Sequence, residues 1–568
     1  MILARRLALP RLSRRPASDL ADRVFVLGGQ GLLLVLLLLA VVLPLLAIFW
    51  RGLAGDPGQG GGLASALEFL ASAHFRWLLG NSLATAGTVV ALVVPVAYLF
   101  AYALQRACLP AKTLWRGLSL LPLLAPSMLP GIALIYLFGN QGLLRGLVAD
   151  NIYGFWGIVL GQALYTFPHA LMVLLGSLAL ADARLFDAAA SLGASPWRAF
   201  RTLVWPATRQ GVFAASCLVL SLCITDFGVP VVVGGNYQTL ALEAYKVVMG
   251  QQQFGRGALI GLCLLLPALL SFAVDLWLRR QRGALDGRAQ VYRPRPAPLR
   301  DGGLLLLVVL VCTLLVGVFG TAVYSSLVRF WPYDLSLSLH NYAFSDLPGG
   351  WQAYGNSLVL ASSSALLGGL LIFTSTYLLE KTPQTALTRL LRLLCFIPMA
   401  VPGLVLGLGY VFFYNLPANP LHGLYGGLPL LVVCTVAHFL TTAQLTAATA
   451  QRQLDDEFEA VARSLKVPLA LHFLRVTLPL CLPALLDSIR YLFVSAMTTV
   501  SAAIFLYSPD SLLAAIAVLN LDDAGNVGGA AAMATLILLT SAGVSLLIAG
   551  LSRGLLRHTQ AWRAPTAS

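Results

Sequence analysis

Charged residues are scarce in this sequence. Only 11% of its 568 residues are Asp, Glu, Lys or Arg, whereas 58% are hydrophobic. A soluble domain carries roughly 25% charged residues, and the mean hydropathy of this chain is +0.82. A fold of this size could not hide so much apolar surface from water. The composition therefore excludes an ordinary soluble protein and predicts one that lies in a lipid bilayer.

The sequence also has little that could hold a metal or carry out catalysis. Its eight cysteines stand singly in or beside apolar segments, without a Cys-x-x-Cys pair or a His at metal-ligand spacing. The apolar segments contain no Ser/His/Asp set and no pair of carboxylates. We therefore predict no catalytic residue, no metal site and no cofactor, which argues against a membrane-embedded enzyme.

Lysine is rare as well, and none of the four lysines follows a glycine. A phosphate-binding loop requires Gly-Lys before Ser or Thr, so any energy from ATP must come through a separate subunit. The net charge of +14 could suggest nucleic acid as a partner, but the basic residues are not clustered with aromatic ones. Their distribution fits membrane topology instead, and we predict no nucleic-acid partner.

Long runs without charge are abundant, and Gly31–Trp50 is one example. About twenty residues, at a rise of 1.5 Å each, cross the hydrocarbon core of a bilayer. The runs predict an all-α membrane protein with about twelve transmembrane helices, six in each half. They lie near 25–50, 79–104, 117–138, 155–180, 210–233, 256–278, 303–328, 356–379, 390–413, 424–449, 484–507 and 527–551.

The basic residues predict the orientation of these helices. With the N-terminus inside, 30 of the 37 Lys and Arg residues fall in inner loops and six in outer loops. Cytoplasmic loops carry such an excess, so both termini are expected in the cytoplasm. The first apolar run resembles a signal peptide, but it is too long and no small-residue cleavage site follows it. We interpret it as an uncleaved first helix.

Three short patterns recur in the same order in the two halves. Gly80–Leu83 recurs as Gly355–Leu358, the Pro-x3-Pro-Gly of 126–131 as 398–403, and the Ser-Leu…Pro of 191–206 as 464–479. The halves are therefore expected to be parallel repeats. We assign 1–278 to the first half, the Arg-rich stretch 279–302 to a cytoplasmic linker and 303–568 to the second half. Pro126, Pro130, Pro398 and Pro402 are expected to break their helices locally.

One inner loop carries an alanine-rich motif. It comprises Asp187, Ala188, Ala189 and Gly193, followed by Pro206. Alanine favours a thin, closely packing helix, and an acid in its first turn suits the helix dipole. Gly193 permits a turn at positive φ, and Pro206 is expected to start the returning helix. The motif predicts a short helix in this loop, either an ordinary amphipathic loop helix or one with a special role.

The equivalent loop of the second half carries a degenerate copy. Glu459, Ala460 and Ala462 precede Lys466 and Pro479. Aligned on the proline, Ala460 stands where the acid should be and Lys466 replaces the glycine. A residue other than glycine is disfavoured at positive φ, so this loop is expected to turn differently from the first.

These two loops resemble the cytoplasmic signature of ABC importer permeases, whose pattern is Glu-Ala-Ala, three residues, Gly, nine residues, Ile-x-Leu-Pro. The resemblance covers essentially the whole chain, which is similar to the fused two-half permeases of ferric-iron, thiamine and 2-aminoethylphosphonate importers. Asp226–Leu259, Asp456–Leu469 and Tyr491–Ser511 look closest to the 2-aminoethylphosphonate permeases, and ferric-iron permeases share part of the first stretch.

The resemblance implies a bacterial inner-membrane protein with the type I ABC importer permease fold. It implies two copies of a cytoplasmic ATPase, docked on the two loops, and a periplasmic substrate-binding protein as partners. 2-Aminoethylphosphonate is the expected cargo, and ferric iron, thiamine or a polyamine is the alternative. A secondary transporter or channel is a second class of function, but more acids within the membrane would then be expected.

Polar residues within the apolar segments are candidates for the transport pathway, because burying them in lipid is costly. Asp226 could line the pathway or equally cap a turn at Gly228–Pro230. His169 and His438 are as compatible with packing as with a pathway. The hydroxyl and amide candidates are Thr225, Asn81, Tyr491, Ser495, Thr498 and Thr499.

Overall fold

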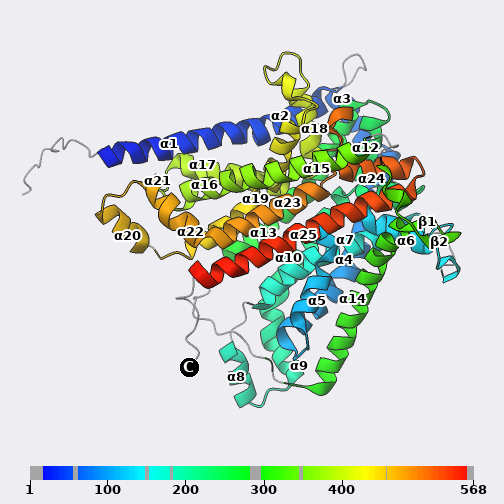
Figure 1. Ribbon diagram of the computed structural model, residues 1–568, viewed down its shortest axis with the longest axis horizontal. Helices are drawn as coiled ribbons and strands as arrows, with labels where there is room; N and C mark the ends of the chain where they lie inside the picture. The colour runs from blue at the N-terminus through cyan, green and yellow to red at the C-terminus, as the bar shows by residue number, and fades with distance from the viewer. Residues whose placement is uncertain are drawn as a thin grey trace, which may run out of the picture.

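The computed structural model describes residues 17–55, 62–147, 152–179, 183–281, 294, 296–344, 349–455 and 457–559. Within these residues the protein is a bundle of long helices with a single two-stranded hairpin (Figure 1). Leu, Val and Ala side chains fill its interior. The predicted all-α fold is confirmed.

Nine helices of the described residues are long and apolar enough to cross a bilayer. Six are single α-helices and three are joined through a short π-helical turn. The single helices are α4 (Ala73–Arg106), α7 (Phe155–Ala179), α13 (Phe254–Gln281), α14 (Pro298–Ser326), α19 (Leu428–Arg452) and α25 (Val527–Thr559). The joined ones are α1 (Ala17–Leu37) with α2 (Leu43–Ala54), α9 (Pro196–Ala199) with α10 (Trp205–Thr225), and α15 (Gly350–Ser363) with α16 (Gly369–Glu380).

The other three of the twelve expected segments are broken. The chain bends by 112° between α17 (Ala386–Phe396), which a short 3₁₀ turn extends to Ala400, and α18 (Gly403–Tyr414). It bends by 78° between 469–480, containing α21 (Leu469–His472) and α22 (Leu478–Leu480), and α23 (Leu482–Thr498). Segment 117–138 is divided between α5 (Lys112–Ser119) and α6 (Leu129–Phe138). About twelve helices were expected, and the described residues contain nine long apolar helices, or eleven spans if each bent pair counts as one.

The repeated prolines lie at the breaks in the third segment of each half. Ala125, just before Pro126, is extended at φ −121°, and Val401, just before Pro402, is extended at φ −113°. The ring of a proline disfavours a helical conformation in the residue before it. The predicted local breaks at Pro126 and Pro402 are confirmed, whereas Pro130 lies in the first turn of α6 and Pro398 in the first turn of the 3₁₀ helix Ile397–Ala400.

The predicted fifth segment, 210–233, is not one helix. Helix α10 ends at Thr225, Asp226 is extended, and the chain starts a new short helix, α11 (Gly228–Val233). In the second half, α23 ends at Thr498, and the extended Thr499 precedes a series of turns. Broken backbone at membrane depth is tolerated only where protein or a water-filled cavity surrounds it.

The first helix of each half packs on the third segment of the other half. Helix α2 lies against α18, and α14 lies against α5 and α6. The Tyr410 hydroxyl on α18 donates a hydrogen bond of 2.8 Å to the Ala40 carbonyl, within the π-helical turn before α2. The Gln30 amide on α1 donates to the Leu378 carbonyl on α16 at 3.3 Å. The two halves are therefore interlocked rather than side by side.

The Gly-Asn-Ser-Leu repeat performs the same task in each half. The hydroxyl oxygen of Ser82 accepts a 2.8 Å hydrogen bond from the Leu240 amide, at the start of α12 (Leu240–Met249). The hydroxyl oxygen of Ser357 accepts a 2.8 Å hydrogen bond from the Ala514 amide, at the start of α24 (Ala514–Asp523). An identical task at equivalent places supports parallel repeats. Part of the predicted linker, 282–293 and 295, lies outside the described residues.

The two ends of the bundle differ. Helices α8 (Ala183–Ser191) and α20 (Glu457–Ser464) lie at one end, together with the start of α1 and the end of α25 (Figure 1). The opposite end carries α3 (Leu63–Ala71), α12, α24 and the antiparallel hairpin of β1 (Val328–Phe330) and β2 (Asp334–Leu337), in which Val328 pairs with Leu337.

Candidate functional site

The first alanine-rich motif forms the predicted short helix, α8. Two hydrogen bonds close its C-terminus: the Leu192 amide donates to the Ala188 carbonyl at 3.1 Å, and the Ala194 amide donates to the Ala189 carbonyl at 3.0 Å. Between them Gly193 takes φ of 68°. A left-handed residue that closes a helix in this way is the common Schellman ending. Asp187 and Ala188 are exposed.

The second motif ends in the same way. The Leu465 amide donates to the Val461 carbonyl at 3.0 Å, and the Val467 amide donates to the Ala462 carbonyl at 2.9 Å. Lys466 takes φ of 53° although it is not a glycine. The expectation that this loop turns differently is therefore wrong. A left-handed conformation costs a residue with a Cβ about 1–2 kcal/mol, and the paired hydrogen bonds and the exposed lysine side chain accommodate it.

Pro206 lies in the first turn of α10, as expected, and Pro479 lies in the first turn of α22, but in both halves the helical path starts earlier. The first returning helix begins at Pro196, and Pro468 caps the second. Pro206 and Pro479 each follow a π-helical turn, Phe200–Val204 and Phe473–Thr477. Inside a helix a proline cannot donate to the carbonyl four residues earlier, and its ring clashes with that carbonyl. The wider π turn relieves this conflict at equivalent places in both halves.

The second returning helix contains an additional bend. Pro483 lies just after the 78° break, where the first half has Gln210. Cys481, between α22 and α23, has φ of −97° and ψ of 9°, outside the helical range. The second proline in five residues is the reason that α10 is continuous while 469–498 is broken.

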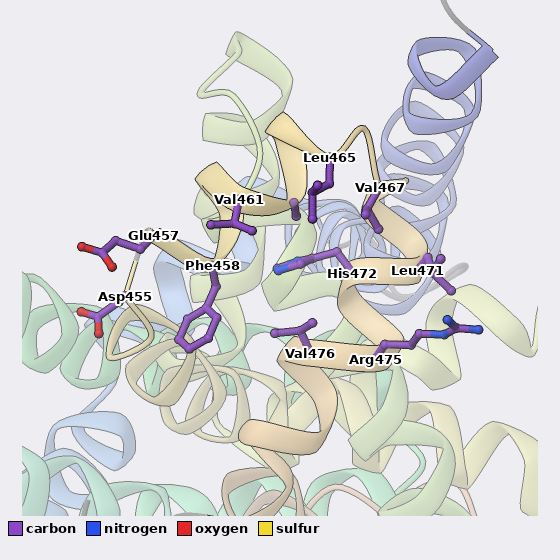
Figure 2. Close-up of a pocket in the computed structure, with 11 residues that line it drawn as sticks. Asp455, Glu457, Phe458, Val461, Leu465, Val467, Leu471, His472, Arg475 and Val476 are labelled. Atoms are coloured by element: carbon purple, nitrogen blue, oxygen red, sulfur yellow. The ribbon is translucent and has the colours of Figure 1, made fainter. Parts of the chain in front are cut away.

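Both short helices present apolar side chains to the outside. Leu192 is 86% exposed, and its equivalent Leu465 is 70% exposed. Beside α20 the chain forms a groove of about 610 Å³, shown in Figure 2. Its lining residues, mostly apolar, are Asp455, Glu457, Phe458, Val461, Ala462, Leu465, Val467, Leu471, His472, Arg475 and Val476. Exposed apolar surface of this kind at two equivalent points is typical of a protein-docking site.

Asp226 caps the break between α10 and α11. Its carboxylate accepts hydrogen bonds from the amides of Gly228 at 3.0 Å and Val229 at 3.3 Å. The Gln162 side chain on α7 also donates to it, at 3.3 Å. These contacts favour the capping alternative, and they occupy the carboxylate with the backbone of α11.

The broken segments of each half meet closely. A Cβ at Gly228 would lie 2.5 Å from the Ser127 hydroxyl oxygen, and one at Gly403 would lie 2.5 Å from the Ser501 hydroxyl oxygen. The break in the third segment thus touches the break in the fifth in both halves. A Cβ at either glycine would displace the serine hydroxyl, so glycine favours this approach of non-helical backbone inside the bundle.

The other pathway candidates lie on α4, α10 and α23, except Thr499, which directly follows α23. The hydroxyls of Thr225 and Thr498 donate to the carbonyls of Ser221 at 2.8 Å and Val494 at 2.9 Å. Such backbone bonds satisfy a hydroxyl within an apolar bundle. Thr499 is buried, whereas Tyr491 and Ser495 are half-buried and interact with each other. Asn81 lies apart from them and donates to the Gln238 carbonyl at 3.0 Å.

Sequence reasoning missed Tyr165 on α7. It is half-buried and lies within electrostatic range of both Asp226 and Tyr491, so it links candidates from the two halves. Its carbonyl lies 3.2 Å from Nδ1 of His169, one helical turn away. The ring of His438 packs against Phe439 with centroids 4.6 Å apart. In the described part of the chain no group of His, Cys, Asp and Glu is arranged to hold a metal ion.

Two parallel helical halves, each with paired breaks inside the bundle and a short exposed helix at the same end, define a multi-pass membrane transport permease. The family described as "binding-protein-dependent transport system inner membrane component" matches residues 94–283 and 377–557, one copy in each half. The chain belongs to this family. It is thus an inner-membrane permease component of a binding-protein-dependent importer.

Several relatives are similar to the chain over most of their length. The ferric transport system permease protein FbpB of Actinobacillus pleuropneumoniae is 26% identical over 548 residues, which cover 92% of this chain and 77% of the relative. The Fe(3+)-transport system permease protein FbpB 2 of Haemophilus influenzae is 24% identical, over 86% of this chain and 91% of the relative. The molybdenum transport system permease protein ModB of Escherichia coli K12 is 28% identical, over 36% of this chain and 94% of its own length.

Proposed function

We propose that this chain supplies both halves of the membrane pore of an ATP-driven importer and that ferric iron is its cargo. The single observation that supports ferric iron as the cargo is the similarity, along nearly the whole chain, to two ferric permeases of the same two-half type. Ferric iron, which the sequence left as the alternative, thus has better support than 2-aminoethylphosphonate. None of the relatives described supports 2-aminoethylphosphonate.

Docking of the ATPase falls to α8 and α20. Each is short, ends in a left-handed residue and exposes a leucine, Leu192 or Leu465. One ATPase subunit of a pair would bind each helix, at the end of the bundle where α1 starts and α25 ends. This end is then cytoplasmic, together with both termini, as the excess of basic residues in these loops predicts.

The pathway would run where the halves face each other, beside the paired helix breaks. Tyr165 from the first half and Tyr491 and Ser495 from the second supply hydroxyls there. The hydroxyls of Thr225 and Thr498 already donate to backbone carbonyls, so they contribute only weak polarity to the pathway. A sparse polar lining favours release over tight binding, so the binding protein would set most of the selectivity.

2-Aminoethylphosphonate remains a second candidate because of the three stretches quoted above, Asp226–Leu259, Asp456–Leu469 and Tyr491–Ser511. It is a zwitterion that cannot cross lipid unaided, since unpaired charges are costly to bury. The same weakly polar lining would pass either solute. The two candidates therefore have to be separated by uptake, not by the lining.

The decisive experiment compares cells that carry the gene with cells that lack it. Uptake of ⁵⁵Fe(III) and of labelled 2-aminoethylphosphonate is measured in both, with thiamine and a polyamine as further substrates. Loss of ferric uptake alone on deletion supports the proposal. Loss of 2-aminoethylphosphonate uptake with ferric uptake intact would establish the second candidate, and no loss with any substrate would contradict the importer itself.

A further inference from the structure

Two basic residues occupy the same place in the two halves. Arg106 is the last residue of α4, and Lys381 directly follows α16. Each comes four residues after a tyrosine, Tyr102 or Tyr377, in otherwise similar sequences. The tyrosines themselves are matched, because Tyr102 packs on Phe200 and Tyr377 packs on Phe473, the first residues of the equivalent π turns.

Both basic residues reach the short exposed helix of their own half. The guanidinium carbon of Arg106 lies 4.6 Å from the centre of the Phe186 ring on α8. The ammonium of Lys381 lies 2.7 Å from Oε1 of Glu459 on α20. Phe186 and Glu459 are equivalent positions, one residue before Asp187 and Ala460. One point on each short helix is thus held by one point at the end of a long helix.

These links are buried although the short helices are largely exposed. Arg106 is 3% exposed, and its Nη2 also donates to the Leu178 carbonyl at the end of α7, at 3.0 Å. The side chains of Lys381 and Glu459 are 7% and 18% exposed. A buried contact transmits displacement better than a solvated one, because close-packed interiors have low compressibility and pass on strain.

The end of α16 is itself braced. Glu380, next to Lys381, accepts two hydrogen bonds from Arg452 on α19, at 2.8 and 2.9 Å. A second arginine, Arg392 on α17, lies 3.6 Å from the same carboxylate. A movement of α20 that pulls on Lys381 therefore acts on a junction of three helices, just as one of α8 acts through Arg106 on α4 and α7.

We propose that Arg106 and Lys381 are positioning residues that pass the movement of α8 and α20 to the long helices of each half. This role rests on the proposed docking of an ATPase on α8 and α20. In this proposal a cation–π contact transmits the movement in the first half, and an ion pair transmits it in the second. The two links have the same place and different chemistry, so different substitutions break and restore them.

The second link is tested by charge exchange. Lys381→Met and Glu459→Gln each leave one charge without its partner, and the double variant Lys381→Glu with Glu459→Lys restores a pair of opposite polarity. Permease, ATPase and binding protein are reconstituted in liposomes, and uptake and ATP hydrolysis are measured together. Each single variant is expected to lower uptake per ATP at least fivefold with the ATPase still bound. The double variant is expected to return within twofold of wild type.

Asp487→Asn is the matched control, because it breaks a partly exposed ion pair with Arg490 on α23, outside the groove and outside α20. It should leave uptake per ATP unchanged. Single variants with an unchanged ratio, or a charge exchange no better than the single variants, would overturn the assignment. In the first half, Arg106→Lys should retain most of the coupling and Arg106→Met should lose it, because lysine keeps the cation over Phe186.

A second measurement needs no ATPase. Hydrogen exchange of the α20 amides is followed in the isolated permease in nanodiscs. Lys381→Met should speed this exchange at least fivefold, and the control Asp487→Asn should not. Unchanged exchange would overturn the link even if transport fell. Conversely, one outcome is that the wild-type permease binds no ATPase while Lys381→Met still speeds exchange of the α20 amides. That result would contradict the proposed function and leave the link between Lys381 and Glu459 standing.

Discussion

Gly193 and Lys466 have the same left-handed backbone conformation, with φ of 68° and 53°, and close equivalent helices. The shared turn, and not the residue, is what the two halves have in common. Glycine adopts this conformation at no steric cost, whereas lysine adopts it at a cost of about 1–2 kcal/mol.

Substitution at these two positions should therefore have opposite effects. Gly193→Val places a β-branched residue at positive φ and should lower ATPase association and transport at least fivefold, with membrane insertion intact. Lys466→Gly should retain transport within twofold and match or slightly raise thermal stability. Co-purification of the ATPase and a melting curve of each variant measure both effects. Equal losses in the two variants would contradict a shared turn.

Asp226 should act as a cap and not as a required charge. Asn keeps one acceptor oxygen for these backbone amides, so Asp226→Asn retains part of the cap and should keep transport within about threefold. Asp226→Ala leaves the amides of Gly228 and Val229 without this acceptor and should cost about 1–2 kcal/mol of stability. Thermal unfolding in detergent and uptake are measured together. A stable Asn variant with no transport would instead establish the carboxylate as a pathway group.

Asp522 should make stability depend on pH. It lies on α24, and burial, together with the charge of the neighbouring Asp523, raises the pKa of its carboxyl to about 6 from an ordinary value of 3.8. Below about pH 4 the carboxyl is protonated in both the folded and the unfolded protein. As the pH rises through 6 the folded protein must hold the charge, so the favourable contribution of the neutral form is lost.

Asp522→Asn should consequently stabilise the protein at pH 8, by on the order of 1–3 kcal/mol, and make no difference at pH 4. Unfolding midpoints of both proteins across this range provide the measurement. Asp510→Asn, which changes an exposed acid near the same end, is the control. A stabilisation that is equal at pH 4 and pH 8 would show that ionisation is not the cause.

The sequence predicts those features that rest on local chemistry. Apolar runs predicted the positions of the twelve segments, and the repeated Pro-x3-Pro-Gly predicted the breaks at Pro126 and Pro402. Alanine-rich stretches predicted α8 and α20. Pro483 also gives a local signal, because the equivalent position of the first half is Gln210. This difference between the halves indicates the 78° bend that only the second half has.

Features that depend on distant partners could not be predicted in this way. Asn81 is a polar residue in an apolar segment, but its partner is the carbonyl of Gln238, which no local pattern identifies. The pair of Lys381 and Glu459 lies 78 positions apart along the chain. The intrinsic preference of Lys466 is for negative φ, but the tertiary turn holds it at a φ of 53°.

The crossing of the first helices sets an order for biosynthesis. Helices α1 and α2 leave the ribosome first, but the surface of α17 and α18 that covers them is made only some 350 residues later. Likewise α5 and α6 wait for α14. Until then the Ala40 carbonyl lacks the Tyr410 hydroxyl, and the first half has no finished form of its own. A ribosome that stalls between the halves would thus leave a substrate for membrane quality control, and assembly of the pore becomes a single late event.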